Sequence, residues 1–240
     1  TRGFDDLEAI FFMTLLLLLY FADIPYLGNE VPFYLCRMTR KIWLAGQVVY
    51  IVCATAIYTV AILLSTILIC GQRCYVGNIW SETAVKLAFT SAGKKLSLAA
   101  SEKTLELTRP YACMTTIFFL LFAYALVMVL LIFWFRILWN ELAGMIAGVV
   151  FNGISFIFSP GILQKLLGIS ERKSYLANVA AGWISPLSHA TYHLHNFGYD
   201  RLPSLRDSGI YDMVLVIMLI VLNLYSIRTY HFVFDGTGER

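Results

Sequence analysis

Long apolar runs alternate with shorter polar connections along the chain. Three of these runs contain no charged residue: Ile42–Gln72, Pro110–Phe135 and Leu142–Gln164. About 20 helical residues cross the roughly 30 Å hydrocarbon core of a bilayer, so each run is long enough for a transmembrane helix. The pattern therefore predicts a helical protein that lies in a membrane.

Two further apolar runs are shorter. Met213–Ile227 has 15 uncharged residues and spans a membrane if Ile210 and Tyr211 join it and Arg228 snorkels, whereas Ala9–Ala22 has 14. We expect an all-α, polytopic protein with a single transmembrane domain over residues 1–240. Its five expected spans cover residues 5–24, 42–70, 111–135, 142–160 and 210–228.

Composition supports this class. The chain is 59% hydrophobic and only 14% charged, whereas soluble domains carry about 25% charged residues. The net charge of +3 is small and dispersed, so we expect no nucleic-acid partner. The five cysteines, at positions 36, 53, 70, 74 and 113, fit neither a disulfide framework nor a zinc spacing.

Five alternating spans would place the connections on two faces. The 21–41 connection, the turn at Arg136–Glu141 and the C-terminus would share one face, and segments 71–109 and 165–209 the other. Cations gather at span ends on the first face, which favours the cytoplasm. The two longer segments nevertheless hold eleven lysines and arginines. The charge count therefore argues against placing those segments outside, and composition leaves the orientation open.

The connection between the first two spans predicts a short amphipathic helix over 29–41. Asn29 is a good N-cap, and Glu30 would lie in the first turn. The residues expected to contact a partner protein are Glu30, Val31, Phe33, Tyr34, Leu35, Arg37, Arg40 and Lys41. On the residues alone, an ordinary interfacial loop with cytoplasmic cations is the favoured interpretation, and contact with a partner protein is the alternative.

The order "FADIPYLG", "NEVPFYLCRMTRKIWLAGQ" and then a very long helix, with "GWISPLSHA" (182–190) before the last span, resembles the permease subunit of type-2 ABC transporters. This bacterial, exporter-like class has six spans, so the first helix here would be its second. The resemblance implies that 29–41 is a cytoplasmic coupling helix, which docks a separate ATPase, and that segments 71–109 and 165–209 lie outside.

The same resemblance implies two permease copies or homologues in a bacterial cell membrane. We expect a peptide, lipid-like or other amphipathic export substrate, and no cofactor or catalytic residue in this chain. The sequence has no G-x4-G-K-[ST] phosphate loop, so ATP hydrolysis would belong to the partner chain. It also lacks the G-x-S-x-G elbow of many serine hydrolases.

Two other functions stay open. His189, His193 and His195, with Asp200, could serve a membrane-embedded metal-dependent enzyme, but no Glu follows His189 as in metalloproteases. We therefore expect no metal ligands and place these histidines at a wet membrane edge. The third alternative is a non-transporting assembly or immunity protein. Interfacial positions are expected for Glu141, Trp183 and His189, and hydrogen bonds between helices for Asn152 and Asn223.

Overall fold

The computed structural model describes residues 7–22, 24–25, 37–71, 77–90, 101–158, 160–166, 168, 170 and 173–230. Within these residues all regular secondary structure is helical, and there is no strand. The helices are α1 (Leu7–Tyr20), α3 (Arg40–Cys70), α4 (Glu82–Phe89), α6 (Glu102–Leu107), α7 (Pro110–Leu138), α8 (Glu141–Ile157), α9 (Pro160–Leu166), α10 (Ser174–Ile184), α11 (Pro186–Ala190), the 3-10 turn η4 (Tyr192–Leu194) and α12 (Leu205–Ser226).

Local sequence signals fix where the long helices begin. The Thr39 side chain accepts a hydrogen bond from the Ile42 amide at the start of α3, and Asn140 accepts one from the Ala143 amide at the start of α8. A reciprocal capping box between Ser204 and Asp207 opens α12. These bonds satisfy amides that have no partner inside the helix itself, which is why each helix starts at its capping residue.

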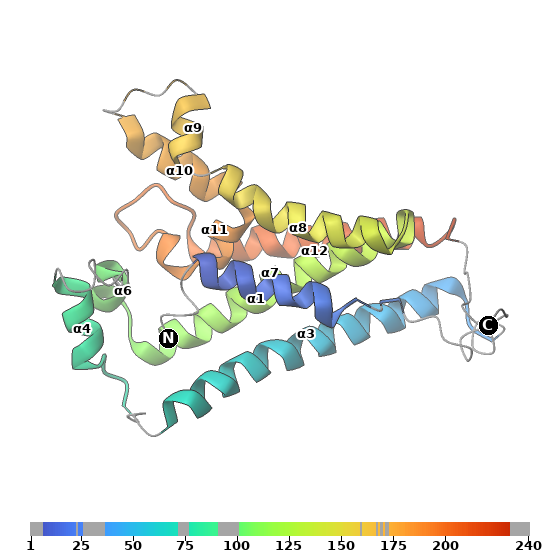
Figure 1. Ribbon diagram of the computed structural model, residues 1–240, viewed down its shortest axis with the longest axis horizontal. Helices are drawn as coiled ribbons and strands as arrows, with labels where there is room; N and C mark the ends of the chain where they lie inside the picture. The colour runs from blue at the N-terminus through green and yellow to red at the C-terminus, as the bar shows by residue number, and fades with distance from the viewer. Residues whose placement is uncertain are drawn as a thin grey trace.

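Helices α1, α3, α7, α8 and α12 form an elongated bundle (Figure 1). Each of them runs in the opposite direction to the one before it in this order. The end of α1, the start of α3, the α7–α8 turn and the end of α12 lie together. We call this the cationic end. The start of α7 lies at the opposite end with α4, α6, α10 and α11, and we call this the polar end. The two-sided arrangement expected from alternating spans is therefore present in the described residues.

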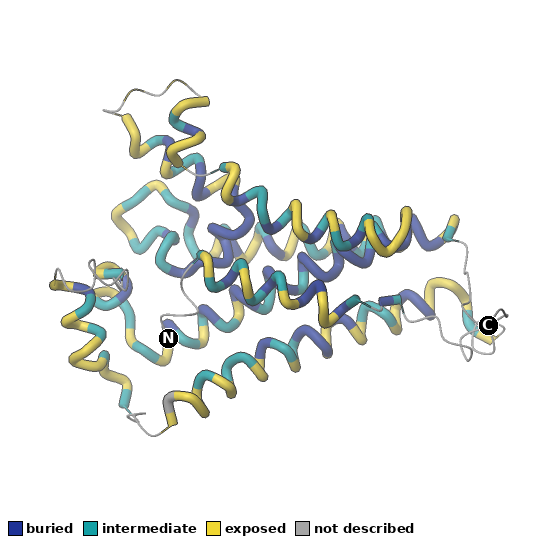
Figure 2. The backbone as a smooth tube through the Cα atoms, in the orientation of Figure 1, coloured by how far each residue is buried: buried dark blue, intermediate teal, exposed yellow. Residues whose placement is uncertain are grey.

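Helix α7 is the centre of the bundle. In its most apolar 18-residue stretch 61% is buried, against 22% in α3 and in α12. Helices α3, α8 and α12 all pack on α7, and α1 packs on both α7 and α8. The outward faces of α3 and α12 are exposed along their length (Figure 2) and carry large apolar side chains such as Leu68 and Val221. A surface of this kind suits hydrocarbon better than water.

Among the described residues, three helices are long and apolar enough to cross a membrane: α3, α7 and α12. Helices α8 and α9 would make a fourth span if counted together, although their axes differ by 72°. The expected helices at 42–70, 111–135, 142–160 and 210–228 all exist, with ends shifted by a few residues. The expected span at 5–24 contains only the 14 residues of α1, about 21 Å of helix, so the count of five spans is not confirmed.

The packing of α8 on α7 depends on small residues in the stretch "AGMIAGVVFNG" (143–153). Gly144 and Gly148 are buried and lie one turn apart. A Cβ atom at Gly144 would meet the Arg136 Cγ at 2.4 Å and the Ile132 carbonyl oxygen at 2.8 Å. The two helix backbones approach this closely only because these positions have no side chain.

Candidate functional site

The cationic end contains the described part of the expected coupling segment. Residues 26–36, which include Glu30, Val31, Phe33, Tyr34 and Leu35, lie outside the described residues. Arg37 is exposed, and α3 begins with Arg40 and Lys41, which are also exposed. The structure therefore presents three cations on the surface at the start of the longest helix, and the amphipathic helix itself stays a prediction.

Arg40 also stabilises the fold at this end. Its Nη1 lies 2.6 Å from the carbonyl oxygen of Arg228 and 3.4 Å from that of Ile227. These carbonyls follow α12, where the helix dipole places partial negative charge, so a guanidinium there is favourable. Arg40 thus joins the start of α3 to the end of α12, a contact between residues far apart in the sequence.

A second arginine, Arg136, also stabilises the end of a helix, but from inside the protein. Arg136 lies in the last turn of α7, at the end of this helix, but it is only 5% exposed because it is enclosed by the protein. Its Nη1 donates to the carbonyl oxygens of Phe21, at 3.1 Å, and of Ile24. The cation therefore caps the end of α1, and the Gly144 position leaves room for its side chain beside α8.

A hydrogen-bonded network crosses the middle of the bundle at Asn152. Its Nδ2 donates to the Phe11 carbonyl at 3.0 Å and to Thr14 Oγ1 at 2.9 Å, and its Oδ1 accepts from the Tyr124 hydroxyl at 3.0 Å. The network links α8, α1 and α7. The expectation that Asn152 bonds to neighbouring helices is confirmed.

Asn223 and Asp212, two buried polar residues on α12, each have a side-chain oxygen with no hydrogen-bond partner. Asn223 Nδ2 donates to the carbonyl oxygens of Leu219 and, at 3.4 Å, of Leu130 on α7, but its Oδ1 has no hydrogen-bond partner. Asp212 is 3% exposed, and its Oδ2 likewise has no partner. Asp212 was not among the expected site residues, although it falls inside the expected span at 210–228, where a carboxyl group is unusual.

At the polar end, two histidines face each other across a serine. His189 Nδ1 and His195 Nε2 each lie 2.8 Å from the Ser208 hydroxyl oxygen. His189 also stacks on the Tyr211 ring at 4.2 Å, and both histidines are almost completely buried. Burial lowers the pKa of His189. His189 is therefore an interior residue rather than one exposed at a membrane edge.

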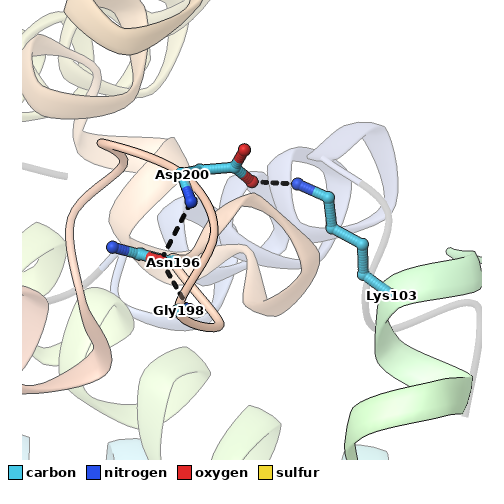
Figure 3. A network of polar contacts seen from close by, with 4 residues as sticks. All are labelled: Lys103, Asn196, Gly198 and Asp200. Carbon is cyan, nitrogen blue, oxygen red and sulfur yellow. Dashed lines mark hydrogen bonds and ion pairs between the residues drawn. The ribbon is translucent and has the colours of Figure 1, made fainter.

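The two polar segments contact each other at this end. Lys103 on α6 forms an ion pair with Asp200, in the loop between η4 and α12 (Figure 3). The Asn196 side-chain oxygen accepts hydrogen bonds from the Gly198 and Asp200 amides, which shapes that loop. Gly198 has φ +107°, a conformation that favours glycine. Asp200 is thereby placed opposite Lys103.

The arrangement does not support a metal centre. Among the described residues, no group of three His, Cys, Asp or Glu side chains could hold an ion. His189 and His195 instead bond to Ser208, and Asp200 pairs with Lys103. The metal-dependent enzyme suggested by the H-x3-H-x-H spacing therefore gains nothing from the geometry.

Glu141 and Trp183, which were also expected at the membrane interface, lie at opposite ends of the bundle. Glu141 is exposed in the first turn of α8, where an acid is favourable near the helix N-terminus. Trp183 is 48% exposed at the polar end, and its indole Nε1 donates to the Arg201 carbonyl at 3.0 Å.

No protein-family model, no curated protein and no solved structure matches this chain.

Proposed function

We propose that this protein is the membrane-spanning subunit of an ATP-driven exporter of the type-2 ABC class, working as a dimer of permeases with a separate ATPase in a bacterial cell membrane. The observation that carries the proposal is the cationic end. There the described residues place exposed Arg37, Arg40 and Lys41 at the start of a 31-residue helix.

Through the contacts at the cationic end, movement of a docked ATPase would be transmitted to the helices of the bundle. An ATPase that pushed on the connection before α3 would act on Arg40, which bonds to the end of α12. Helix α3 is continuous for 31 residues, about 46 Å, so a tilt at one end would displace the other. ATP-driven movement would thereby change the packing of α3 and α12 on α7. The peptide, lipid-like or other amphipathic substrate stays a proposal from the sequence.

The experiment measures whether the ATPase stays bound. Burying a Phe or Leu side chain contributes about 1.5–3 kcal/mol, whereas an exposed ion pair contributes about 0–1. Phe33→Asp with Leu35→Asp is therefore expected to release the ATPase when the complex is purified in detergent. The ATPase chain is recognised by its G-x4-G-K-[ST] motif and quantified against the permease.

A matched control lies at the opposite end. Val85 and Phe89 are exposed on α4, so Val85→Asp with Phe89→Asp makes the same chemical change far from the cationic end. This variant should keep the ATPase, and so should Arg37→Ala. The proposal is wrong if the wild type and the Phe33 and Leu35 double variant, both correctly inserted, recover equal amounts of ATPase. Residues 29–41 would then have no coupling role.

A further inference from the structure

Asp212 is a carboxyl group enclosed within the bundle. It lies in α12, inside the expected span at 210–228, and is 3% exposed. Its Oδ2 has no hydrogen-bond partner, and the residue takes part in no ion pair in the part of the chain that the structure describes. Ionisable residues are rare inside membrane spans, where they usually serve a function. The proposed coupling to an ATPase does not use this one.

The charged residues near Asp212 were sought on α12 and on the two long helices that pack against it. Apart from Asp212, the charged residues of α3, α7 and α12 lie in terminal turns: Arg40, Lys41, Arg136, Arg206 and Asp207. Arg40 contacts the chain beyond the end of α12, about 21 Å of helix away from Asp212. Arg206 is exposed, about 9 Å of helix away. No cation on these helices therefore pairs with the carboxyl group.

The titratable neighbours of Asp212 are rings without a positive charge. Tyr124 on α7 and Tyr211 on α12 interact electrostatically with Asp212. His189, on the short helix α11 that also packs on α12, stacks on the Tyr211 ring. Burial lowers the pKa of His189, so its ring is neutral at neutral pH. These groups do not compensate a carboxylate.

The size and chemistry of the site decide what Asp212 can bind. An unpartnered carboxylate in the interior is costly, and a bound cation would remove that cost. The described residues contain no group of three His, Cys, Asp or Glu side chains that could hold a metal ion. An organic cation would need space beside a side chain that is almost completely enclosed. A proton needs neither further ligands nor space.

We infer that Asp212 is a proton-binding site in the interior of the bundle. The side chain is the neutral acid while α12 packs on α7. When water reaches it, the O–H bond breaks, the proton passes to water and the carboxylate remains. Proton binding at Asp212 is therefore linked to the packing of α12 on α7.

The composition of α12 suits such a link. Five residues of this helix are buried, and four of them are polar: Ser208, Asp212, Asn223 and Ser226, with Leu219 as the fifth. Asn223 Nδ2 lies 3.4 Å from the Leu130 carbonyl and Ser226 Oγ lies 3.0 Å from Trp134 Nε1, so both hold α12 to α7 near the cationic end. A face of this kind exposes little apolar surface when water enters beside Asp212. This inference does not depend on the proposed transport function.

The test is infrared spectroscopy of the full chain in lipid bilayers at about pH 7. A protonated carboxylic acid has a C=O stretching band that a carboxylate lacks. We expect this band in the wild type, shifted when aspartate is labelled with 13C at its side-chain carboxyl and lost in Asp212→Asn. The inference is wrong if the wild type has no acid band, if the label does not shift it, or if the band survives in Asp212→Asn.

Two further variants complete the assignment. Asp200→Asn makes the same exchange at a carboxylate that pairs with Lys103, and it should keep the acid band. Asp212→Glu keeps a carboxyl group at the site, so its acid band should no longer respond to labelled aspartate. A band that still shifts in Asp212→Glu would place the proton on another aspartate. This variant also decides the assignment if Asp212→Asn does not fold.

Hydrogen exchange of the α12 amides tests the link to packing. Wild type and Asp212→Asn are compared at the same pH, because the amide of asparagine imitates the neutral acid and cannot ionise. Protection should be equal at about pH 7, and the wild type should exchange faster at about pH 9, by up to about tenfold for each pH unit. Equal protection at both pH values would show that the proton on Asp212 does not control the packing of α12.

Discussion

At the scale of single residues, two buried polar side chains differ in what surrounds them. Asn152 uses both ends of its amide, with two hydrogen bonds donated and one accepted. Asp212 is equally enclosed, yet its Oδ2 has no partner. A buried polar group costs free energy unless it is bonded, so replacing Asn by Asp at position 152 and Asp by Asn at position 212 should have different effects on stability.

Asn152→Asp should lower the stability of the protein by about 1–3 kcal/mol, because it replaces the donating nitrogen with an oxygen facing the Phe11 carbonyl. The midpoint of thermal unfolding in detergent measures the change. An unchanged midpoint would mean that the network through Tyr124 and Thr14 contributes nothing.

Asp212→Asn should leave that midpoint unchanged or raise it. The substitution replaces a buried carboxyl group, whose Oδ2 has no partner, by an amide that cannot ionise, while the shape of the side chain is kept. A fall as large as that of Asn152→Asp would reveal a partner that only a carboxylate can satisfy.

At the scale of helices, small residues decide how closely α7 and α8 pack. Gly144 and Gly153 both lie inside α8, but a Cβ at Gly153 would meet nothing within 4 Å. Alanine substitutions at these two glycines therefore separate the effect of close packing on stability from the effect of helix propensity.

Gly144→Ala should destabilise the protein, by about 1–3 kcal/mol, because the added methyl group overlaps the Ile132 carbonyl oxygen and the Arg136 side chain on α7. Gly153→Ala should stabilise it by about 0.5–1 kcal/mol, since alanine is the better helix former. Chemical unfolding of both variants in the same detergent makes the comparison. Equal shifts would show that α8 does not pack closely on α7 at Gly144.

Arg40→Ala should lower the stability of the isolated chain by about 0.5–1.5 kcal/mol, because the end of α12 loses its cationic partner. Arg37→Ala, an exposed cation nearby, should change it by less than about 0.5 kcal/mol. The difference between the unfolding midpoints of the two variants measures how much the contact between Arg40 and the end of α12 contributes to stability. If both have the same small effect, Arg40 acts only as a surface charge.

The helices themselves were predictable, whereas their contacts were not. Uncharged runs such as 42–72 determine α3 and α7, because nothing but a helix satisfies so long an apolar backbone in a membrane. The cap that Arg136 gives to the end of α1 depends on residues more than a hundred positions away. The contacts of Ser208 with His189 and His195 were not predictable either, because nothing in the pattern of the three histidines points to a serine on the next helix.

At the scale of the whole molecule, the account depends on two opposite ends. Basic residues at span ends lie at one end, and the contacts between segments 71–109 and 165–209 lie at the other. A plain count of lysine and arginine does not assign sides, because those two segments together hold eleven. Their charges are partly used within the polar end, as Lys103 shows by pairing with Asp200.

The most direct test of the central claim is a measurement of sidedness in intact cells. Arg37→Cys and Tyr199→Cys, at exposed positions of the two ends, are each introduced into a chain whose five native cysteines are replaced. A membrane-impermeant maleimide should label Tyr199→Cys in intact cells and Arg37→Cys only after the membrane is opened. Reversed labelling would contradict a cytoplasmic cationic end and with it the ATPase coupling, and labelling of both from the same side would contradict the membrane-crossing bundle itself.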